Sequence, residues 1–432
     1  MSGNAVENLK INSITIQATD SGNQIDLSSS VMYCDYYEDL LSPCVMMTIQ
    51  IASSYSIFNS LPVRGGEKVE LNMDTLSGNF GLSGDYAMYV YKVSGITNDG
   101  AKEFCTLHLC SREGLTNETA RVQKKYDKKP LNEHVESILK NVLLTNKFKK
   151  ENIERTSNSY SFIGTLKKPF HVLTWLGPKG IPPNQSSGNS GKIAKGVAGF
   201  VFYENKDGFN FRSIETLVSA TKSQIASTEK ESIAKYTYQP GAVESNNPNN
   251  NFSIINYNFE KNIDLMKSLR VGMYSNITYV YDLYQNKVDG VVYSLNSELK
   301  SSLGEDKPYP KDFGNRPSRI ISRSADVGIL DASGNTDDSG RDSADMAKSF
   351  ARYNLLFTQA LNILVPMNIN LQVGNILYAD FQKIDASQSG EVDPSQSGYY
   401  LIKEVRHHFE GGQMLSSLKL VRDSYGLYGA NK

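Results

Sequence analysis

Apolar and polar residues alternate along the first 113 positions of the chain, and a period of two is typical of β-strands with one buried face. The alternation is clearest in LKINSITIQATD, in IDLSSSVMYCDYYEDL and in PCVMMTIQIASS. A glycine-led strand from Gly66 and a hairpin that starts at Tyr89 complete the region. The pattern predicts an antiparallel β domain.

From about residue 114 the period changes to that of a helix. Apolar residues recur at helical spacing directly after Pro130 and predict an amphipathic helix of about four turns. A second, shorter helix is expected from Pro169. The stretch FVFYENKDGFNFRS then predicts a hairpin, because its Asp-Gly pair readily supplies the positive φ of a tight turn. The segment therefore has an α/β character. The apolar positions of the first helix are Leu131, Val135, Ile138, Leu139 and Val142.

Strand patterns resume at residue 252 with FSIINYNFEKNIDLM and continue through MYSNITYVYDLYQNKVDGVVYSL. Residues 298–342 are rich in Ser, Gly, Asp, Asn and Pro and lack periodicity, so a long loop is expected there. A helix is predicted from Asp342 or Ser343 through SADMAKSFARYNLLFTQALN, and the remaining strands follow it. The second β domain is thus predicted to be discontinuous in sequence.

One strand-turn-strand phrase occurs twice. The first copy, from Tyr89, is YVYKVSGITNDGAKEFCTLHLCSRE, and the second, from Tyr400, is YLIKEVRHHFEGGQMLSSLKLVRD. The two copies align without a gap as far as Cys110 and Val421, where one extra residue precedes the first arginine. With that residue allowed for, Arg112 corresponds to Arg422, and each arginine is followed by an acid.

Another shared feature precedes each copy of the phrase. A glycine leads an alternating strand at Gly66 and again at Gly374. Two matching blocks in the same order favour a duplicated antiparallel β domain. Two unrelated hairpins of the kind common in all-β proteins are the alternative.

Length, charge and cysteine content narrow the class of protein. A chain of 432 residues has room for about three domains. The formal net charge of −1 gives no signal for binding to nucleic acid phosphates. The sequence lacks an apolar run of about 18 residues, which a membrane segment would need, and its first residues lack a signal-peptide pattern. Folding in a cytoplasm is therefore expected. The four cysteines are expected to be reduced.

No catalytic or metal-binding pattern emerges, so neither an enzyme nor a cofactor is expected. The run Gly188-Asn189-Ser190-Gly191 lacks the spacing of a nucleophile elbow. His407 and His408 are adjacent on a predicted strand and should point to opposite faces. Acidic spacing from Asp331 to Asp342 echoes a calcium loop, but Thr336 stands where the sharp turn needs glycine.

The closing segment resembles a known family. ALNILVPMNINLQVGNILYADF, followed by GYYLIKEVRHHFEGGQMLSSLKLVRDSYG, is similar to the end of the baseplate hub proteins of contractile-tailed bacteriophages. GFVFYENKDGFNF resembles part of the insert between the two barrel domains of those hubs. The hub region of VgrG is related, but VgrG continues into a spike, whereas this chain stops at Lys432, which implies a separate spike protein.

The resemblance implies a mainly β fold with an α/β insert and two duplicated tube-type antiparallel β-barrel domains, the second discontinuous. The expected domains are a first barrel at 1–113, an α/β insert at 114–222, a second barrel at 223–297 and 343–424, a loop insertion at 298–342, and a tail at 425–432.

It also implies a structural role in the tail baseplate of a virion, with synthesis and folding in the host cytoplasm. Three copies would form a ring of six barrels that adapts the six-fold tail tube to a three-fold central spike and lines the DNA channel. The implied partners are two further copies, the spike protein, tail tube or tube-initiator ring proteins, and surrounding baseplate proteins. DNA would only pass through the lumen.

Four residues are candidates for structural roles. Arg112 and Arg422 could form ion pairs between domains, or lie at solvated strand ends. Gly66 and Gly374 lead the paired strands. Two other functions stay open: a carbohydrate-binding tail or adhesin protein, because Tyr and Asn suit sugar surfaces, and a cell-wall hydrolase, which would need paired carboxylates or a metal in a cleft.

Overall fold

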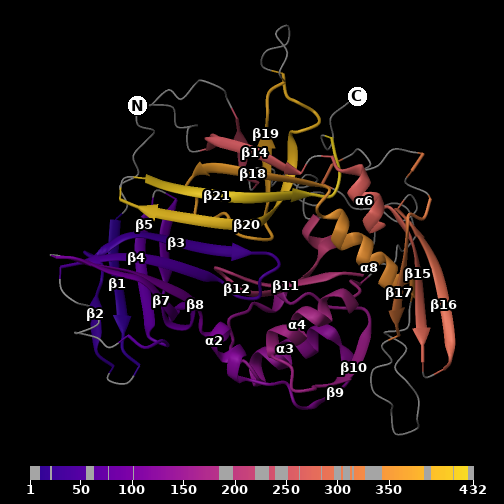
Figure 1. The fold of residues 1–432 in the computed structure, drawn as a ribbon, viewed down its shortest axis with the longest axis horizontal. Helices are drawn as coiled ribbons and strands as arrows, with labels where there is room; N and C mark the ends of the chain where they lie inside the picture. The colour runs from indigo at the N-terminus through magenta and orange to yellow at the C-terminus, as the bar shows by residue number, and fades with distance from the viewer. Residues whose placement is uncertain are drawn as a thin grey trace.

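The structure is a computed structural model, and it is dominated by a 14-stranded sheet (Figure 1). Two further two-stranded sheets and one three-stranded sheet accompany it in the part of the chain that is described. The described residues are 10–19, 22–54, 63–75, 77–100, 102–183, 198–218, 233–238, 252–261, 263–283, 285–295, 303–304, 312–313, 316–325, 343–383, 391–411 and 413–426.

The first half of the large sheet is built by the N-terminal residues and runs in the order β3-β4-β8-β7-β5-β1-β2. Its strands alternate as predicted, and their inward side chains form one apolar core that includes Ile14, Ile49, Leu71, Val90 and Leu107. The elements are β1 (Lys10–Gln17), β2 (Gln24–Asp26), β3 (Val31–Asp39), β4 (Met46–Ser53), β5 (Lys68–Thr75), β6 (Gly78–Leu82), the 3₁₀ turn η1 (Gly84–Tyr86), β7 (Met88–Asp99) and β8 (Lys102–Ser111).

The C-terminal strands form the second barrel, in the order β14-β18-β21-β20-β19-β13. This order matches β3-β4-β8-β7-β5-β1 strand for strand, so the predicted duplication is confirmed. One difference is direction, because β13 is parallel to β19 whereas β1 is antiparallel to β5. The elements are β13 (Lys235–Thr237), β14 (Asn256–Lys261), β18 (Gln359–Pro366), β19 (Ile376–Asp380), β20 (Gly398–Glu410) and β21 (Gln413–Arg422).

The two leading glycines fix the correspondence between the copies. The Gly66 amide donates to the Val90 carbonyl at 2.7 Å, and the Gly374 amide donates to the Ile402 carbonyl at 3.0 Å. Val90 is therefore equivalent to Ile402, one residue away from the gap-free alignment, which is wrong in this strand. The cause is a bulge in β7 between Ser94 and Thr97, which gives the first copy an extra residue.

The insert lies between the barrels in sequence and beneath the large sheet in Figure 1. Both predicted helices and the predicted hairpin are confirmed, and Gly208 of the hairpin turn has a φ of 113°. The apolar face of α3 packs with the aromatic residues of the hairpin in one core. The elements are α2 (Arg112–Thr119), β9 (Lys125–Pro130), α3 (Leu131–Asn141), η2 (Lys150–Asn152), β10 (Ser159–Ile163), α4 (Pro169–Leu176), η3 (Gly177–Lys179), β11 (Phe200–Asn205) and β12 (Gly208–Ser213).

Two strands expected in the second barrel belong to a separate sheet instead. β15 (Ser275–Asp282) pairs with β16 (Lys287–Ser294) and with β17 (Arg319–Ser324), and none of them joins the large sheet. β17 arises from within the predicted 298–342 loop. Alternation identifies a strand but does not say which sheet it pairs with, and this is why the assignment failed. The short helix α6 (Leu265–Val271) precedes β15.

The helix expected from residue 343 to Asn362 is shorter than predicted. α8 runs from Ser343–Leu355, and β18 already begins at Gln359. The Leu355 carbonyl accepts hydrogen bonds from the Thr358 amide and hydroxyl, which ends the helix. After this turn the apolar residues alternate with a period of two, as a strand requires.

Some sequence predictions fall outside the described residues. These are the calcium-like spacing from Asp331 to Asp342, the Gly188–Gly191 run, most of the polar stretch around 220–250, and residues 427–432. Within the described part of the chain, no helix is long and apolar enough to cross a membrane.

Candidate interaction site at the domain junctions

The two barrels are joined by a direct strand pairing. β20 of the second barrel lies antiparallel to β3 of the first, from Glu404 opposite Asp39 to Glu410 opposite Tyr33. We call this pairing the seam. Because it consists of main-chain hydrogen bonds within one continuous sheet, it holds the barrels in a fixed relation.

On one face of the seam, an acidic side chain of β3 binds two side chains of β20. Asp35 accepts hydrogen bonds from the Nε and Nη2 atoms of Arg406 at 3.0 and 2.9 Å, and its Oδ1 lies 2.7 Å from His408 Nδ1. Burial acts to raise the pKa of Asp35, but the hydrogen bonds from Arg406 and His408 outweigh it and hold the pKa below its usual value. The seam thus carries a partly buried charge network.

On the opposite face, Glu38 of β3 joins three parts of the molecule. Its carboxylate accepts hydrogen bonds from the Val373 amide at 2.9 Å, from the Lys206 amide at 2.6 Å and from the Tyr36 hydroxyl at 3.1 Å. Val373 precedes β19 of the second barrel, and Lys206 lies in the turn of the insert hairpin. Burial raises the pKa of Glu38 to about 7, against the effect of these donors.

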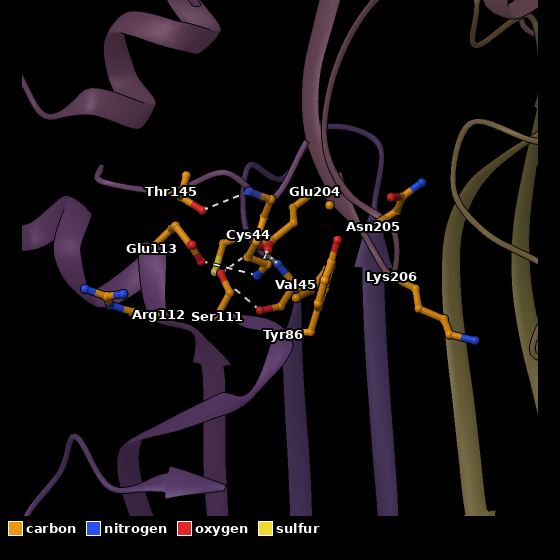
Figure 2. Close-up of polar contacts among 12 residues, drawn as sticks. Cys44, Val45, Tyr86, Ser111, Arg112, Glu113, Thr145, Glu204, Asn205 and Lys206 are labelled. Carbon is orange, nitrogen blue, oxygen red and sulfur yellow. Dashed lines mark hydrogen bonds and ion pairs between the residues drawn. The ribbon is translucent and has the colours of Figure 1, made fainter. Parts of the chain in front are cut away.

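The first barrel and the insert meet at a buried ion cluster (Figure 2). Lys147 of the insert lies 2.6 Å from Glu204 of β11 and 3.3 Å from Glu113 of α2, and all three side chains are at most 4% exposed. Glu204 also accepts hydrogen bonds from the Ser111 hydroxyl at 2.7 Å and the Val45 amide at 3.1 Å. Residues from β8, α2 and β11 therefore share one charge centre.

The electrostatics of this cluster follow from its burial. Burial raises the pKa of Glu204, and the charge of Lys147 offsets this only in part. Burial acts to lower the pKa of Lys147, but the carboxylates of Glu204 and Glu113 outweigh it, so the pKa is raised. Lys147 is thus held as a cation at neutral pH, and its removal would leave two acids in a dry environment.

The two candidate arginines lie in different surroundings. Arg112 is exposed at the start of α2 and, in Figure 2, points away from the ion cluster. Arg422 is fully buried at the end of β21, where its guanidinium donates to the Ser397 and Ser395 carbonyls and lies 4.7 Å from the ring centre of Tyr400. The alternative of a solvated strand end is therefore wrong for Arg422.

The acid that follows each arginine makes the ion pair with an inserted segment. Glu113 binds Lys147 of the insert, and Asp423 binds Arg352 of α8 at 2.7 Å. Asp423 is fully buried and also accepts a hydrogen bond from the Leu303 amide at 2.9 Å. The repeated arginine-acid pair marks these contacts in the sequence, but the acids make the ion pairs that were predicted for the arginines.

The two candidate glycines both adopt positive φ, 93° at Gly66 and 85° at Gly374. A side chain would meet different obstacles at the two positions. An added Cβ at Gly374 would lie 2.3 Å from the Tyr203 hydroxyl oxygen of the insert hairpin, whereas at Gly66 the nearest atom would be Thr19 Oγ1 at 3.6 Å. Gly374 therefore lets the insert pack closely against the second barrel.

His407 and His408 point to opposite faces, as the sequence predicted. His407 is buried, with Nδ1 2.8 Å from the Ser416 hydroxyl and Nε2 3.2 Å from the Leu371 carbonyl, and burial lowers its pKa to about 4. Across the described residues, no group of three or more His, Cys, Asp or Glu side chains is placed to hold a metal ion. All four cysteines are free.

A hollow of about 740 Å³ lies over the seam. Its walls mix both signs of charge with tyrosine and amide side chains, so it presents no uniformly basic surface. Its lining includes Tyr37, Asp39, Tyr91, Asn362, Arg406 and Lys419.

Two solved structures of tail proteins share this architecture. The 43 kDa tail protein of prophage MuSo2 from Shewanella oneidensis has a TM-score of 0.55 with 9% identity, covering 97% of this chain and 99% of that one. The tail protein from Neisseria meningitidis MC58 has a TM-score of 0.51 with 10% identity, covering 95% of this chain and 96% of that one. These likenesses establish the fold.

A curated sequence makes the class more specific. The "Probable baseplate hub protein gp334" of Vibrio phage KVP40 is 20% identical over 440 aligned residues, covering 98% of this chain and 96% of the relative. No family model matches the chain. The predicted resemblance to baseplate hub proteins is confirmed over almost the whole length. The matches support a function of this chain as a phage tail or baseplate hub protein, with a location in the tail baseplate.

Proposed function

We propose that this chain is the central hub of a phage baseplate, and that three copies form a ring of six barrels. The observation that carries the proposal is the shared strand order of the two barrels, together with their union in one sheet through the seam. Two similar barrels in a fixed relation give each chain two successive positions of a ring. Three chains then supply six similar positions with three-fold symmetry overall.

Such a ring fits a six-fold tube on one side and a three-fold spike on the other. The six barrels repeat the contact that each tube subunit needs, while features present once per chain repeat three times. The insert and the three-stranded sheet are such features, because neither has a counterpart among the described residues of the other half of the chain. We therefore assign the tail tube or its initiator ring to the barrels, and the spike and the surrounding baseplate proteins to the inserted segments.

The junctions support a structural role rather than a catalytic one. The Lys147 and Arg352 ion pairs and the hydrogen bonds to Glu38 tie the insert, α8 and the barrels together at buried positions. Removal of any of these contacts would leave a buried charge or donor unpaired, so the arrangement resists local opening. We propose no catalytic step and no cofactor for this protein.

The hollow over the seam is consistent with a channel wall. Asp39 and Glu404 accompany Arg406 and Lys419 there, so the surface has no net positive field to hold a phosphate backbone. We assign this face of the seam to the lumen, through which DNA passes without being bound. Synthesis in the host cytoplasm, before assembly into the virion, completes the proposal.

The molar mass of the purified chain tests the proposal. Light scattering is performed on the chain alone and after mixing with the candidate spike protein of the same virion. The hub account predicts a particle with three copies of the 47.9 kDa chain in at least one condition. A monomer in both conditions, with no association with the spike, contradicts it.

A carbohydrate-binding tail protein is the second candidate. The hollow is lined by Tyr37, Tyr91 and Asn362, and aromatic rings with amide groups suit the faces and hydroxyls of sugars. A glycan array decides between the two. Saturable binding by a monomer, lost in Tyr37→Ala but not in the exposed control Tyr281→Ala, would favour this function over the hub.

A further inference from the structure

The strand edges that form the seam each have an equivalent in the other barrel. β3 pairs with β4 as β14 pairs with β18, and β20 pairs with β21 as β7 pairs with β8. The edge of β3 is therefore equivalent to the edge of β14, and the edge of β20 to the edge of β7. Within the chain only the first pair of edges meets.

The second pair of edges is open. β14 pairs only with β18, and β7 beyond Val90 pairs only with β8, as far as the described residues go. An open edge presents a row of main-chain donors and acceptors and is a template for another strand. Ile96 in the open part of β7 is 56% exposed, and Ile255 next to β14 is 37% exposed. Both edges therefore also expose apolar surface.

We propose that β14 of one copy pairs antiparallel with β7 of a second copy, and so repeats the seam between chains. The inference rests on the proposed ring and names the strands that close it. The contact is of the head-to-tail kind, because two different edges meet, and such a contact closes a ring when the rotation allows it. The partner is a second copy of this chain, because its β7 edge is the equivalent of the β20 edge that pairs with β3.

The register follows from the seam. His408 lies opposite Asp35 there, and Leu415 pairs with His408 as Phe104 pairs with Thr97. On the other side, Thr48 pairs with Asp35 as Asn362 pairs with Asn258. Thr97 is thus equivalent to His408 and Asn258 to Asp35. The proposed contact places Thr97 opposite Asn258.

Two bulges support this register independently. β7 carries an extra residue between Ser94 and Thr97, and β14 carries one between Phe259 and Lys261. No bulge interrupts the paired parts of β3 and β20. A single bulge in one strand would shift every later pair by one residue and turn the side chains to the wrong face.

In the proposed pairing the two extra residues lie opposite each other, Gly95 against Glu260. The register therefore continues without a shift, and Ser94 lies opposite Lys261. Gly95 has a φ of 65°, a conformation that glycine adopts without strain. Each bulge lies at the position where the other requires it, although no pairing among the described residues of one chain brings the two strands together.

The side chains of the two contacts differ in charge. The seam pairs Asp35 with Arg406 and His408, whereas the contact between chains would pair Asn258 with Thr97 and Tyr257 with Asn98. At these two pairs the neutral side chains need no ionic partner. If β7 of another chain replaced β20 on β3, Asp35 would lose its cationic partners, and this discourages the wrong pairing.

Cysteine pairs test the strand assignment and its register. The variant Thr97→Cys/Asn258→Cys places thiols on directly opposite residues, which lie about 4.5–5.5 Å apart between Cα atoms and within the range of a disulfide. The matched control Thr97→Cys/Asn256→Cys keeps the same face but shifts the register by two residues, to about 7–8 Å. Both variants are oxidised and run on non-reducing gels beside the two single-cysteine chains, which report the background from the native cysteines.

We expect covalent dimers and trimers from the in-register variant, formed at least tenfold faster than from the shifted control. A mixture of the two single-cysteine chains, Thr97→Cys and Asn258→Cys, should give dimers only, since each chain then carries one introduced thiol. Light scattering of the same samples separates the two levels of failure. A three-chain particle without preferential cross-linking overturns the strand assignment and leaves the ring, whereas the absence of any three-chain particle overturns both.

Discussion

The two barrels share one strand order but differ in what is attached to their ends. The first barrel is continuous in sequence, and its last strand leads directly into the insert at Arg112. The second is interrupted by the three-stranded sheet and α8, and its last strand ends against α8 through Asp423. The strand order is kept in both barrels, while the segments packed against each barrel differ.

The ion pairs that hold these segments against the barrels are similar in the two halves of the chain. Each barrel binds its inserted segment through an acid just after the last strand and a cation from the segment, Glu113 with Lys147 and Asp423 with Arg352. In the first attachment Lys147 also pairs with a second acid, Glu204. In the second attachment Asp423 instead accepts a further hydrogen bond from the Leu303 amide. Similar chemistry at corresponding places thus secures two unrelated attachments.

Removal of the cations is expected to have the largest effect. Lys147→Met leaves Glu204 and Glu113 buried without a cation, and Arg352→Met does the same to Asp423, so each should lower the free energy of unfolding by about 3–5 kcal/mol. Urea unfolding monitored by circular dichroism measures the change. Lys140→Met, which breaks the exposed pair with Glu136, is the matched control and should cost under about 1 kcal/mol. Equal effects in all three variants would contradict the account.

The two arginines should differ almost as much. Arg422→Ala removes buried charged hydrogen bonds to two carbonyls and should cost about 3 kcal/mol. Arg112→Ala changes an exposed side chain at a helix start and should cost less than about 0.5 kcal/mol. Thermal and urea unfolding of both variants check the difference. A comparable loss in Arg112→Ala would show that the two positions are equivalent after all.

Glu38 should make stability depend on pH. Its pKa is raised from 4.5 to about 7 in the folded chain, so folding favours the protonated form. The unfolded chain releases this proton at lower pH, and the free energy of unfolding should fall as pH rises from about 4.5 to about 7, by at most roughly 3 kcal/mol. The difference between the native chain and Glu38→Gln, measured by urea unfolding across pH 4–8, isolates this effect. A difference that stays constant or grows with pH would be inconsistent with it.

The leading glycines should show the smallest contrast. Both positions have positive φ, so Gly66→Ala and Gly374→Ala should each cost about 1–2 kcal/mol. Gly374→Ala should cost more, because its Cβ would overlap the Tyr203 hydroxyl. Tyr203→Phe removes that oxygen, and the double variant should recover part of the extra loss in urea unfolding. No recovery would place the strain elsewhere.

The sequence predicted the duplicated phrase because the strands of the repeat carry their own alternation. It placed Val90 one residue out of register, because a bulge such as that at Gly95 leaves little trace in an apolar pattern. It also extended α8 into β18, where the Leu and Phe residues of LLFTQALN suit either element. The local patterns thus predicted the strands and helices, whereas the tertiary pairing determined their register and where each one ends.

The junctions could be predicted only in part. Lys147 stands in NKFKK, which reads as a solvated charge run, and its partner Glu204 lies 57 residues away in a hairpin. Glu38 stands in an acidic stretch that gives no sign of burial. Contacts of this kind depend on how the domains pack together, and periodicity does not report that. The arginine-acid repeat marked the right place but not the right residue.

Electron cryomicroscopy of the assembled particle, viewed along its axis, tests the central claim most directly. The account predicts a three-fold ring of six barrels, with sheets continuous both within chains through β3 and β20 and between chains through β14 and β7. A particle whose six barrels contact through other strands would contradict the closure. A particle with a different number of barrels, or isolated chains under every assembly condition, would contradict the hub itself.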